Sequence, residues 1–174
     1  MFSLPVSKSG YFFGRFFGSL LLSTLPLLGI YLGVAVGSVL GPLAGWVDAE
    51  KFGPFPWSTL VNSYLLFVVP NMFISGAIIF FLSHKFKSTV VSFVGVLGII
   101  IAYSASGTLL SDLDNEQLGA LLDIFGVGAF SVYTKYWTPA EQNTLAPPFE
   151  GLILYNRLIW IAVGLVISLV SYQL

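Results

Sequence analysis

The 174-residue chain contains no cysteine and few charged side chains, and each shortage narrows what it can be. Without thiols there is no disulfide framework and no thiolate metal site. Charged residues make up 9% of the chain, whereas an ordinary soluble domain has about 25%. The net charge is −1, so no basic surface indicates nucleic acid as a partner.

Recognisable catalytic motifs are also missing. There is no HExxH, GxSxG or Walker A lysine motif, and no pair of histidine or carboxylate residues has metal-ligand spacing. The single histidine, His84, lies in a polar break between two apolar stretches, where a solvated loop residue is expected. We therefore predict that the chain is not an enzyme and binds no cofactor. An intramembrane enzyme is the alternative, and it would need polar catalytic residues that face each other inside the bilayer.

Apolar residues, by contrast, are abundant at 56% and lie in four long uncharged stretches. A helix needs about 20 such residues to cross the hydrocarbon core of a bilayer. The pattern predicts an all-α polytopic membrane protein with one transmembrane domain over residues 1–174. The expected spans are about 17–41, 57–83, 88–110 and 152–173, with a folded outer loop over 111–151. The first stretch is too long for the apolar core of a cleaved signal peptide, which the residues before it would otherwise suit.

The distribution of charge predicts the orientation of the spans. Lys8, Arg15, Lys85 and Lys87 fall on one side of the membrane, where no acidic residue accompanies them. All eight acidic residues fall on the other side, together with three basic ones. Because loops rich in lysine and arginine stay inside, both termini are expected in the cytoplasm.

The outer loop carries signals of local structure. Ser111 followed by acidic residues predicts a helix start, and an apolar stripe follows over 118–125. The apolar run 124–133 is too short to span and suits a helix in the interface or dipping into the membrane. Thr138, with proline next and Glu141 three residues on, predicts a second helix start with a capping box.

Small residues in the first span predict helix packing. Four glycines at intervals of four form one groove on a helix, and a neighbouring backbone approaches closely at such a groove. It serves either as a static packing seam or as a surface on which helices slide, and in both cases it needs a partner helix. The four are Gly29, Gly33, Gly37 and Gly41.

Polar residues in the second span give a further set of expectations. Pro70 is expected to kink the helix and free a carbonyl group, and Asn71 is expected to face other helices or that carbonyl. The alternative is that Asn62 and Asn71 line a substrate path. No charged residue is expected deep in a span, which argues against an ion-coupled carrier. Arg157 is placed at the outer membrane edge, within reach of Glu141 or Glu150.

A family resemblance rests on several short motifs taken in order. Pro5-Val6-Ser7-Lys8 and Tyr11-Phe12-Phe13-Gly14-Arg15-Phe16 precede the first span, and Pro70-Asn71 lies in the second. Tyr136-Trp137-Thr138, with Glu141 and Asn143, comes next, and Tyr155-Asn156-Arg157 enters the last span. In this order the chain resembles the membrane subunits of type-2 ABC exporters, in a bacterial branch whose larger members are fused to a zinc aminopeptidase domain.

The resemblance implies a function and a set of partners. The chain would be the permease part of an ATP-driven exporter in the bacterial inner membrane, with a separate ABC ATPase subunit and a second permease half or a second copy. Lys8, Tyr11, Gly14 and Arg15 would end the segment that contacts the ATPase, unless Lys8 and Arg15 serve as headgroup anchors. The family has six helices, so the first two, like the peptidase, would be missing here. The other reading is a non-transport scaffold or anchor in a larger membrane complex.

Overall fold

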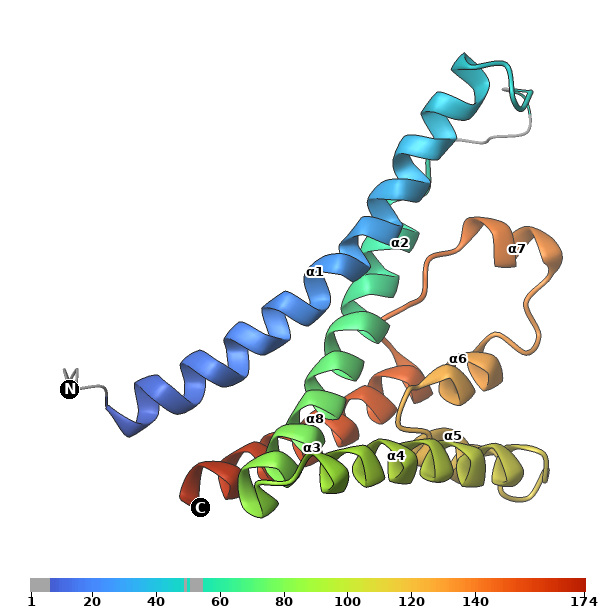
Figure 1. Ribbon diagram of the computed structural model, residues 1–174. Coiled ribbons are helices and arrows are strands. Elements are labelled where there is room, and N and C mark those ends of the chain that lie inside the picture. Colours follow the sequence, from blue (N-terminus) through green and yellow to red (C-terminus); the bar gives the residue numbers. More distant parts are fainter. Residues whose placement is uncertain (1–6, 49, 51–54) are drawn as a thin grey trace.

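The computed structural model describes residues 7–48, 50 and 55–174, and the regular elements of this part are all helical (Figure 1). The motif residues Pro5 and Val6 lie outside the described residues. The elements are α1 (Lys8–Leu43), α2 (Trp57–Ser63), a π-helical segment (Tyr64–Val68), α3 (Val69–Phe86), α4 (Thr89–Leu110), α5 (Glu116–Leu122), α6 (Val127–Tyr133), α7 (Pro139–Thr144) and α8 (Gly151–Gln173).

Four of the helices are long and apolar enough to cross a membrane, which confirms an all-α polytopic membrane protein. They are α1, the continuous helix Trp57–Phe86, α4 and α8. Most of their large apolar side chains are exposed, as expected for surfaces that contact lipid. The boundaries of the last three agree with the predicted spans to within three residues.

The first span differs most from its prediction, because α1 begins at Lys8. Ser7 caps it by accepting a hydrogen bond from the Gly10 amide at 3.1 Å, so the segment expected before the span forms its first turns. At 36 residues α1 is about 54 Å long, well beyond a hydrocarbon core of about 30 Å. It therefore has to tilt or project from the membrane. Figure 1 shows it bending in its middle part, where Pro26 removes a backbone donor.

The helix Trp57–Phe86 departs from regular α-helical hydrogen bonding close to Pro70, where the sequence predicts a kink. A π-helical turn over Tyr64–Val68 stands directly before Pro70, and the Val69 amide bonds the Tyr64 carbonyl five residues back. The wider turn accommodates a proline that can neither donate a hydrogen bond nor tolerate the usual carbonyl position. The structure thus has a π-turn directly before Pro70, while the kink and the freed carbonyl group stay predictions.

The core lies where α3 packs against α8 and α4. Ile74 and Ile153 are fully buried there. Ala120 of α5, Ala129 of α6 and Ile124 of the break between them belong to the same two clusters. Gly164 lets α8 approach α3 closely, because a Cβ atom at that position would lie 2.7 Å from the Phe73 ring. The short helices are thus part of the packed bundle.

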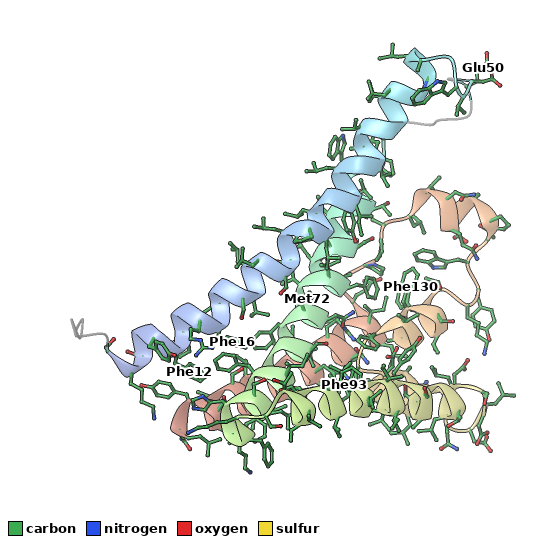
Figure 2. All side chains as sticks on the ribbon, in the orientation of Figure 1. Phe12, Phe16, Glu50, Met72, Phe93 and Phe130 are labelled. Carbon is green, nitrogen blue, oxygen red and sulfur yellow. The ribbon has the colours of Figure 1, made fainter. Side chains whose placement is uncertain are left out.

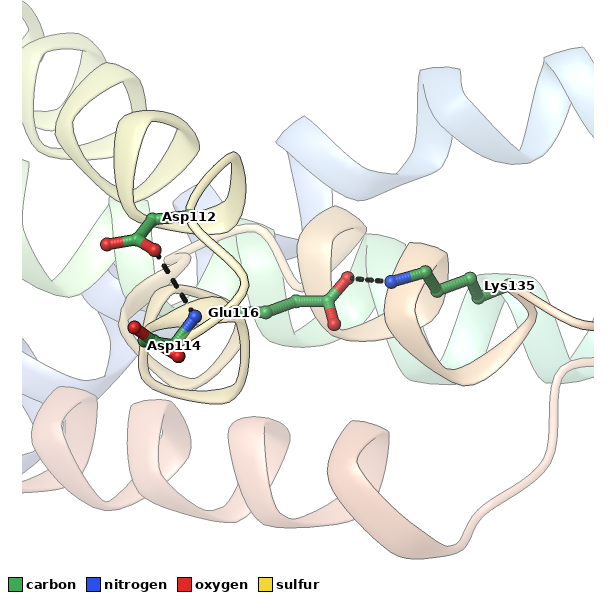
Figure 3. Close-up of polar contacts among 4 residues, drawn as sticks. All are labelled: Asp112, Asp114, Glu116 and Lys135. Atoms are coloured by element: carbon green, nitrogen blue, oxygen red, sulfur yellow. Dashed lines mark hydrogen bonds and ion pairs between the residues drawn. The ribbon is translucent and has the colours of Figure 1, made fainter.

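The segment after α4 corrects one prediction. No helix begins at Ser111, which instead ends α4; α5 starts at Glu116. The acidic residues that suggested a helix start make a turn, in which Asp112 accepts hydrogen bonds from the Asp114 amide and the Asn115 side chain. Figure 3 shows this turn beside the ion pair between Glu116 and Lys135, which joins α5 to the end of α6 at 2.7 Å.

Aromatic contacts gather the start of α1, the end of α3 and the end of α8 at one end of the molecule. Lys8 Nζ lies 5.4 Å from the centre of the Tyr172 ring, and Phe12 contacts the rings of Phe80, His84 and Tyr172. Phe12 and Phe16, labelled in Figure 2, are 5% and 2% exposed. One side of the molecule therefore holds the described start of the chain, the α3–α4 turn and the C-terminus. Four consecutive spans, each running opposite to the one before, require this arrangement.

Candidate functional site

A cluster of buried polar side chains lies where α3 and α8 meet the break between α5 and α6. It consists of Asn71, Asp123, Asn156 and Arg157, which we call the buried polar cluster. Asp123 and Asn156 are completely buried and Arg157 is 2% exposed. Polar groups so far from water are costly unless they are hydrogen-bonded, so the partners of each one decide what the cluster does.

Asn156 holds the end of α5. Its amide nitrogen donates to the carbonyl oxygens of Ala120 and Asp123 at 2.7 and 2.8 Å, and to that of Leu121 at 3.2 Å. These are carbonyl groups that a helix leaves without a partner at its C-terminal end. Trp160 Nε1, one turn further along α8, also donates to the Leu121 carbonyl at 3.1 Å.

Arg157 joins three elements through its guanidinium group. Nε donates to Asn156 Oδ1 at 2.9 Å, Nη1 donates to Asn71 Oδ1 at 2.7 Å, and Nη2 donates to the Ile124 carbonyl at 3.1 Å and to Asn156 Oδ1. Asn71 in turn donates to the Phe125 carbonyl at 3.1 Å. Asn71 thus faces other helices, and its side chain is bound to α8 and to the α5–α6 break.

One prediction about Arg157 was wrong, since it pairs with neither Glu141 nor Glu150. Its side chain is buried within the bundle, in the second turn of α8, close enough to Asp123 for that charge to act on it. Glu141 is bound to Thr138, and Glu150 accepts a hydrogen bond from Tyr133. The bundle therefore contains a buried arginine that the sequence pattern did not predict.

The α5–α6 break is shaped around the guanidinium group. Asp123 accepts hydrogen bonds from the amides of Phe125 and Gly128, at 2.9 and 2.6 Å, and so caps the start of α6. Gly126 has φ +73°, and a Cβ atom there would lie 2.3 Å from Arg157 Nη2. A side chain at position 126 would meet both backbone strain and a steric clash.

The hydrogen bonds of the buried polar cluster connect helices and have a structural role. Every polar side chain in it is hydrogen-bonded, either to another member of the cluster or to backbone groups at and between the ends of α5 and α6. The part of the chain that the structure describes contains no group of three or more His, Asp or Glu residues able to hold a metal. The arrangement positions the short helices against the spanning ones.

The predicted outer-loop motif is divided between two places. Thr138 and Glu141 form the predicted capping box of α7, with Thr138 Oγ1 accepting from the Glu141 amide and Glu141 accepting from the Thr138 amide. That amide and the Thr138 hydroxyl hold the pKa of Glu141 below its usual value. Tyr136 and Asn143 are exposed near α7. No hydrogen bond or ion pair among the described residues links them to Asn156 or Arg157, so the motif is not one site.

Asn62 is also placed away from the buried polar cluster. Its amide nitrogen donates to the Pro147 carbonyl at 3.0 Å, which ties α2 to the segment between α7 and α8. Of the polar residues proposed for a path through the second span, only Asn71 enters the cluster.

The glycines of α1 meet no helix of this chain. A Cβ atom at Gly29, Gly33, Gly37 or Gly41 would have no neighbouring atom within 4 Å among the described residues. The groove exists by sequence, but the predicted packing seam does not form within this chain.

A second candidate site lies between α1 and α3, near the end that carries the basic residues. A groove of about 690 Å³ separates the first half of α1 from α3. Arg15, His84 and Lys87 line one end of it, and Ser19, Ser23, Ser75 and Ser83 add hydroxyl groups. We call it the basic groove, because none of its lining residues is acidic. Tyr11, a predicted coupling residue, also lines it, while Gly14 and Lys8 do not.

Comparisons with protein-family models, with curated proteins and with solved structures find no match to this chain. What the chain does must therefore be argued from its own residues.

Asp123 is the cluster residue that the sequence did not single out as a site residue. It was assigned to a solvated outer loop with the other acids, and its partner Arg157 was assigned to the membrane edge. The available signal was local: an aspartate before Ile124-Phe125-Gly126, inside an apolar segment, suits a helix cap at a glycine turn. No local pattern indicates that an arginine more than 30 residues away shares that turn.

Proposed function

We propose that this chain is the membrane-spanning permease component of an ATP-driven, ABC-type exporter, with ATP hydrolysed by a separate subunit. The observation that carries the proposal is the packing of the basic start of α1. Phe12 and Phe16 are buried against Phe80, Phe73 and Tyr172, so a force applied at residues 8–15 reaches both α3 and α8. A soluble motor needs such an attachment to move spanning helices.

The rest of α1 suits the movement that a transporter requires. Beyond Phe16, among the described residues, Gly41 alone is buried, and α1 contacts the bundle through isolated pairs such as the edge-to-face rings of Tyr31 and Tyr64. A helix anchored at one end and loosely packed elsewhere moves at low cost, because few contacts are lost.

Lys8→Glu with Arg15 retained is expected to leave membrane insertion intact and to uncouple ATP hydrolysis from transport. The change reverses the charge at the first residue of α1 and removes the Lys8–Tyr172 contact. ATPase activity and substrate transport are measured on the same reconstituted complex. The matched control is Lys85→Glu, at the same end of the molecule, whose ammonium group lies 5.5 Å from the Phe81 and Phe86 rings. If Lys8→Glu and Lys85→Glu behave alike, the start of α1 is a membrane anchor.

We also propose a bacterial inner membrane as the location, with both termini in the cytoplasm. The support is the charge asymmetry: Lys8, Arg15, Lys85 and Lys87 gather at the end of the molecule that holds the described start of the chain and the C-terminus. Single cysteines at Lys87 and Asp114 test it cleanly, because the native chain has none. In intact cells an impermeant thiol reagent is expected to label position 114 and to spare position 87. The reverse pattern would invert the topology.

Two partners belong to this proposal, an ABC ATPase subunit and a second permease half or second copy. The glycine face of α1 supports the second, because Gly29, Gly33 and Gly37 are not covered by any described part of this chain and glycine faces pack against helices. Co-purification of the full chain, followed by an ATPase assay with and without candidate substrates, tests the proposal as a whole. If the chain assembles stably with other membrane proteins but with no ATPase, it is instead a scaffold. The fully hydrogen-bonded polar cluster is compatible with that role as well.

A further inference from the structure

The basic groove has a composition that the proposed exporter function does not require. Its volume of about 690 Å³ falls in the range of ligand sites, about 300–1,000 Å³. Positive charge gathers at one end, where Arg15 comes from α1 and Lys87 follows α3, and the imidazole of His84 lies beside them. Leu20, Met72 and Ile79 line it further along. The groove is therefore basic at the end near Arg15 and Lys87, and apolar side chains line it further along.

From this arrangement we infer that the basic groove binds an anionic phospholipid of the leaflet at the basic end. The phosphate group lies among Arg15, His84 and Lys87, and an acyl chain follows Leu20, Met72 and Ile79. The inference holds whether or not the chain works with an ATPase.

Charge complementarity selects the headgroup. Arg15 Nη1 donates to the Tyr11 hydroxyl at 2.6 Å, and this contact draws the guanidinium to the groove while leaving its other donors for a phosphate. Lys87 directly follows α3 and has φ 49°, so the chain turns there, and the groove lining contains no acidic side chain. Basic pockets between spanning helices on the cytoplasmic side are a known way of binding anionic headgroups.

The position of the groove selects a lipid over a free anion. The groove opens between two spanning helices, so within a bilayer its apolar part is filled by an acyl chain. The hydroxyl groups of Ser19 and Ser23 donate to carbonyls of their own helix, at 2.9 and 2.8 Å. Both serines therefore present little unsatisfied polarity to a hydrocarbon chain.

The test uses the full chain in vesicles that contain spin-labelled phosphatidylglycerol or spin-labelled phosphatidylcholine. Electron paramagnetic resonance measures the fraction of each lipid immobilised by the protein. The wild type is expected to prefer phosphatidylglycerol. Arg15→Gln combined with Lys87→Gln should reduce that preference about 25-fold, at about 5-fold for each basic residue near an anionic headgroup. Lys85→Gln removes a charge from the same turn and should reduce the preference clearly less, because its ammonium group lies by the Phe81 and Phe86 rings and does not line the groove.

Two further arms identify what is bound. Ser23→Leu fills the groove without changing charge and should reduce immobilised phosphatidylglycerol; Ser19→Leu serves if that variant fails to insert. Inorganic phosphate at millimolar concentration should not displace the lipid. Equal loss in the Lys85→Gln control, no effect of either leucine variant, or displacement by phosphate would each overturn the assignment, in favour of general surface attraction or a free-anion site.

Discussion

Arg157→Leu is expected to destabilise the folded protein by about 3–5 kcal/mol, the cost of breaking a buried charged network by removing one partner. The loss leaves Asn71, Asn156 and the Ile124 carbonyl without the donors that they have now. It also leaves Asp123 buried with no cation acting on it. Leucine retains the apolar part of the side chain but not the guanidinium, so the loss combines broken hydrogen bonds with a small cavity beside Gly126.

The measurement is the unfolding midpoint in detergent, followed by tryptophan fluorescence. Trp160 is a suitable probe, because its indole donates to the Leu121 carbonyl beside the cluster. Arg15→Leu is the matched control, since it removes an arginine from an exposed position. Equal midpoints for Arg157→Leu and the wild type would show that the buried polar cluster does not hold the short helices in place.

Gly126→Ala is expected to cost about 3 kcal/mol, from two sources. A residue other than glycine at φ +73° costs about 1–2 kcal/mol, and the new Cβ atom would lie 2.3 Å from Arg157 Nη2. The guanidinium has to move, so it loses hydrogen bonds worth about 1.5 kcal/mol or more each. Gly98→Ala is the control: nothing lies within 4 Å of its Cβ position, and alanine in a helix interior stabilises by about 0.5–1 kcal/mol.

The double variant with Arg157→Leu and Gly126→Ala separates the backbone strain at position 126 from the contact with the guanidinium group. Where Arg157 is already leucine, Gly126→Ala no longer displaces a guanidinium, so its cost should fall to the backbone term of about 1–2 kcal/mol. Strictly additive costs in the double variant would mean that Gly126 does not act through Arg157.

The local signals in the sequence were strongest where neighbouring residues interact. The capping box at Thr138 and Glu141 formed as predicted, because all its partners lie within one helical turn. The four spans were found from uninterrupted apolar length, since a helix satisfies its own backbone groups in lipid. The disturbance at Pro70 followed from a missing backbone donor.

Local signals misled where the partner was distant. The acidic residues after Ser111 suit a helix start, yet they form a turn because α4 continues through Leu110 and Gly119 then packs against its end. A Cβ atom at Gly119 would lie 2.7 Å from the Leu110 amide nitrogen, so the approach of α5 to α4 fixes where the turn lies. Nothing within one helical turn of Ser111 encodes that approach.

Composition and periodicity thus determined that this chain is a helical membrane protein with four spans and a folded segment between the last two. Only the tertiary structure decided which polar residues are buried together. Asn71, Asp123 and Arg157 come from segments more than 30 residues apart, and each one taken alone suits a loop, a kink or a membrane edge. They share one cluster because the carbonyl groups at the α5–α6 break need donors, and inside the packed bundle no water reaches them.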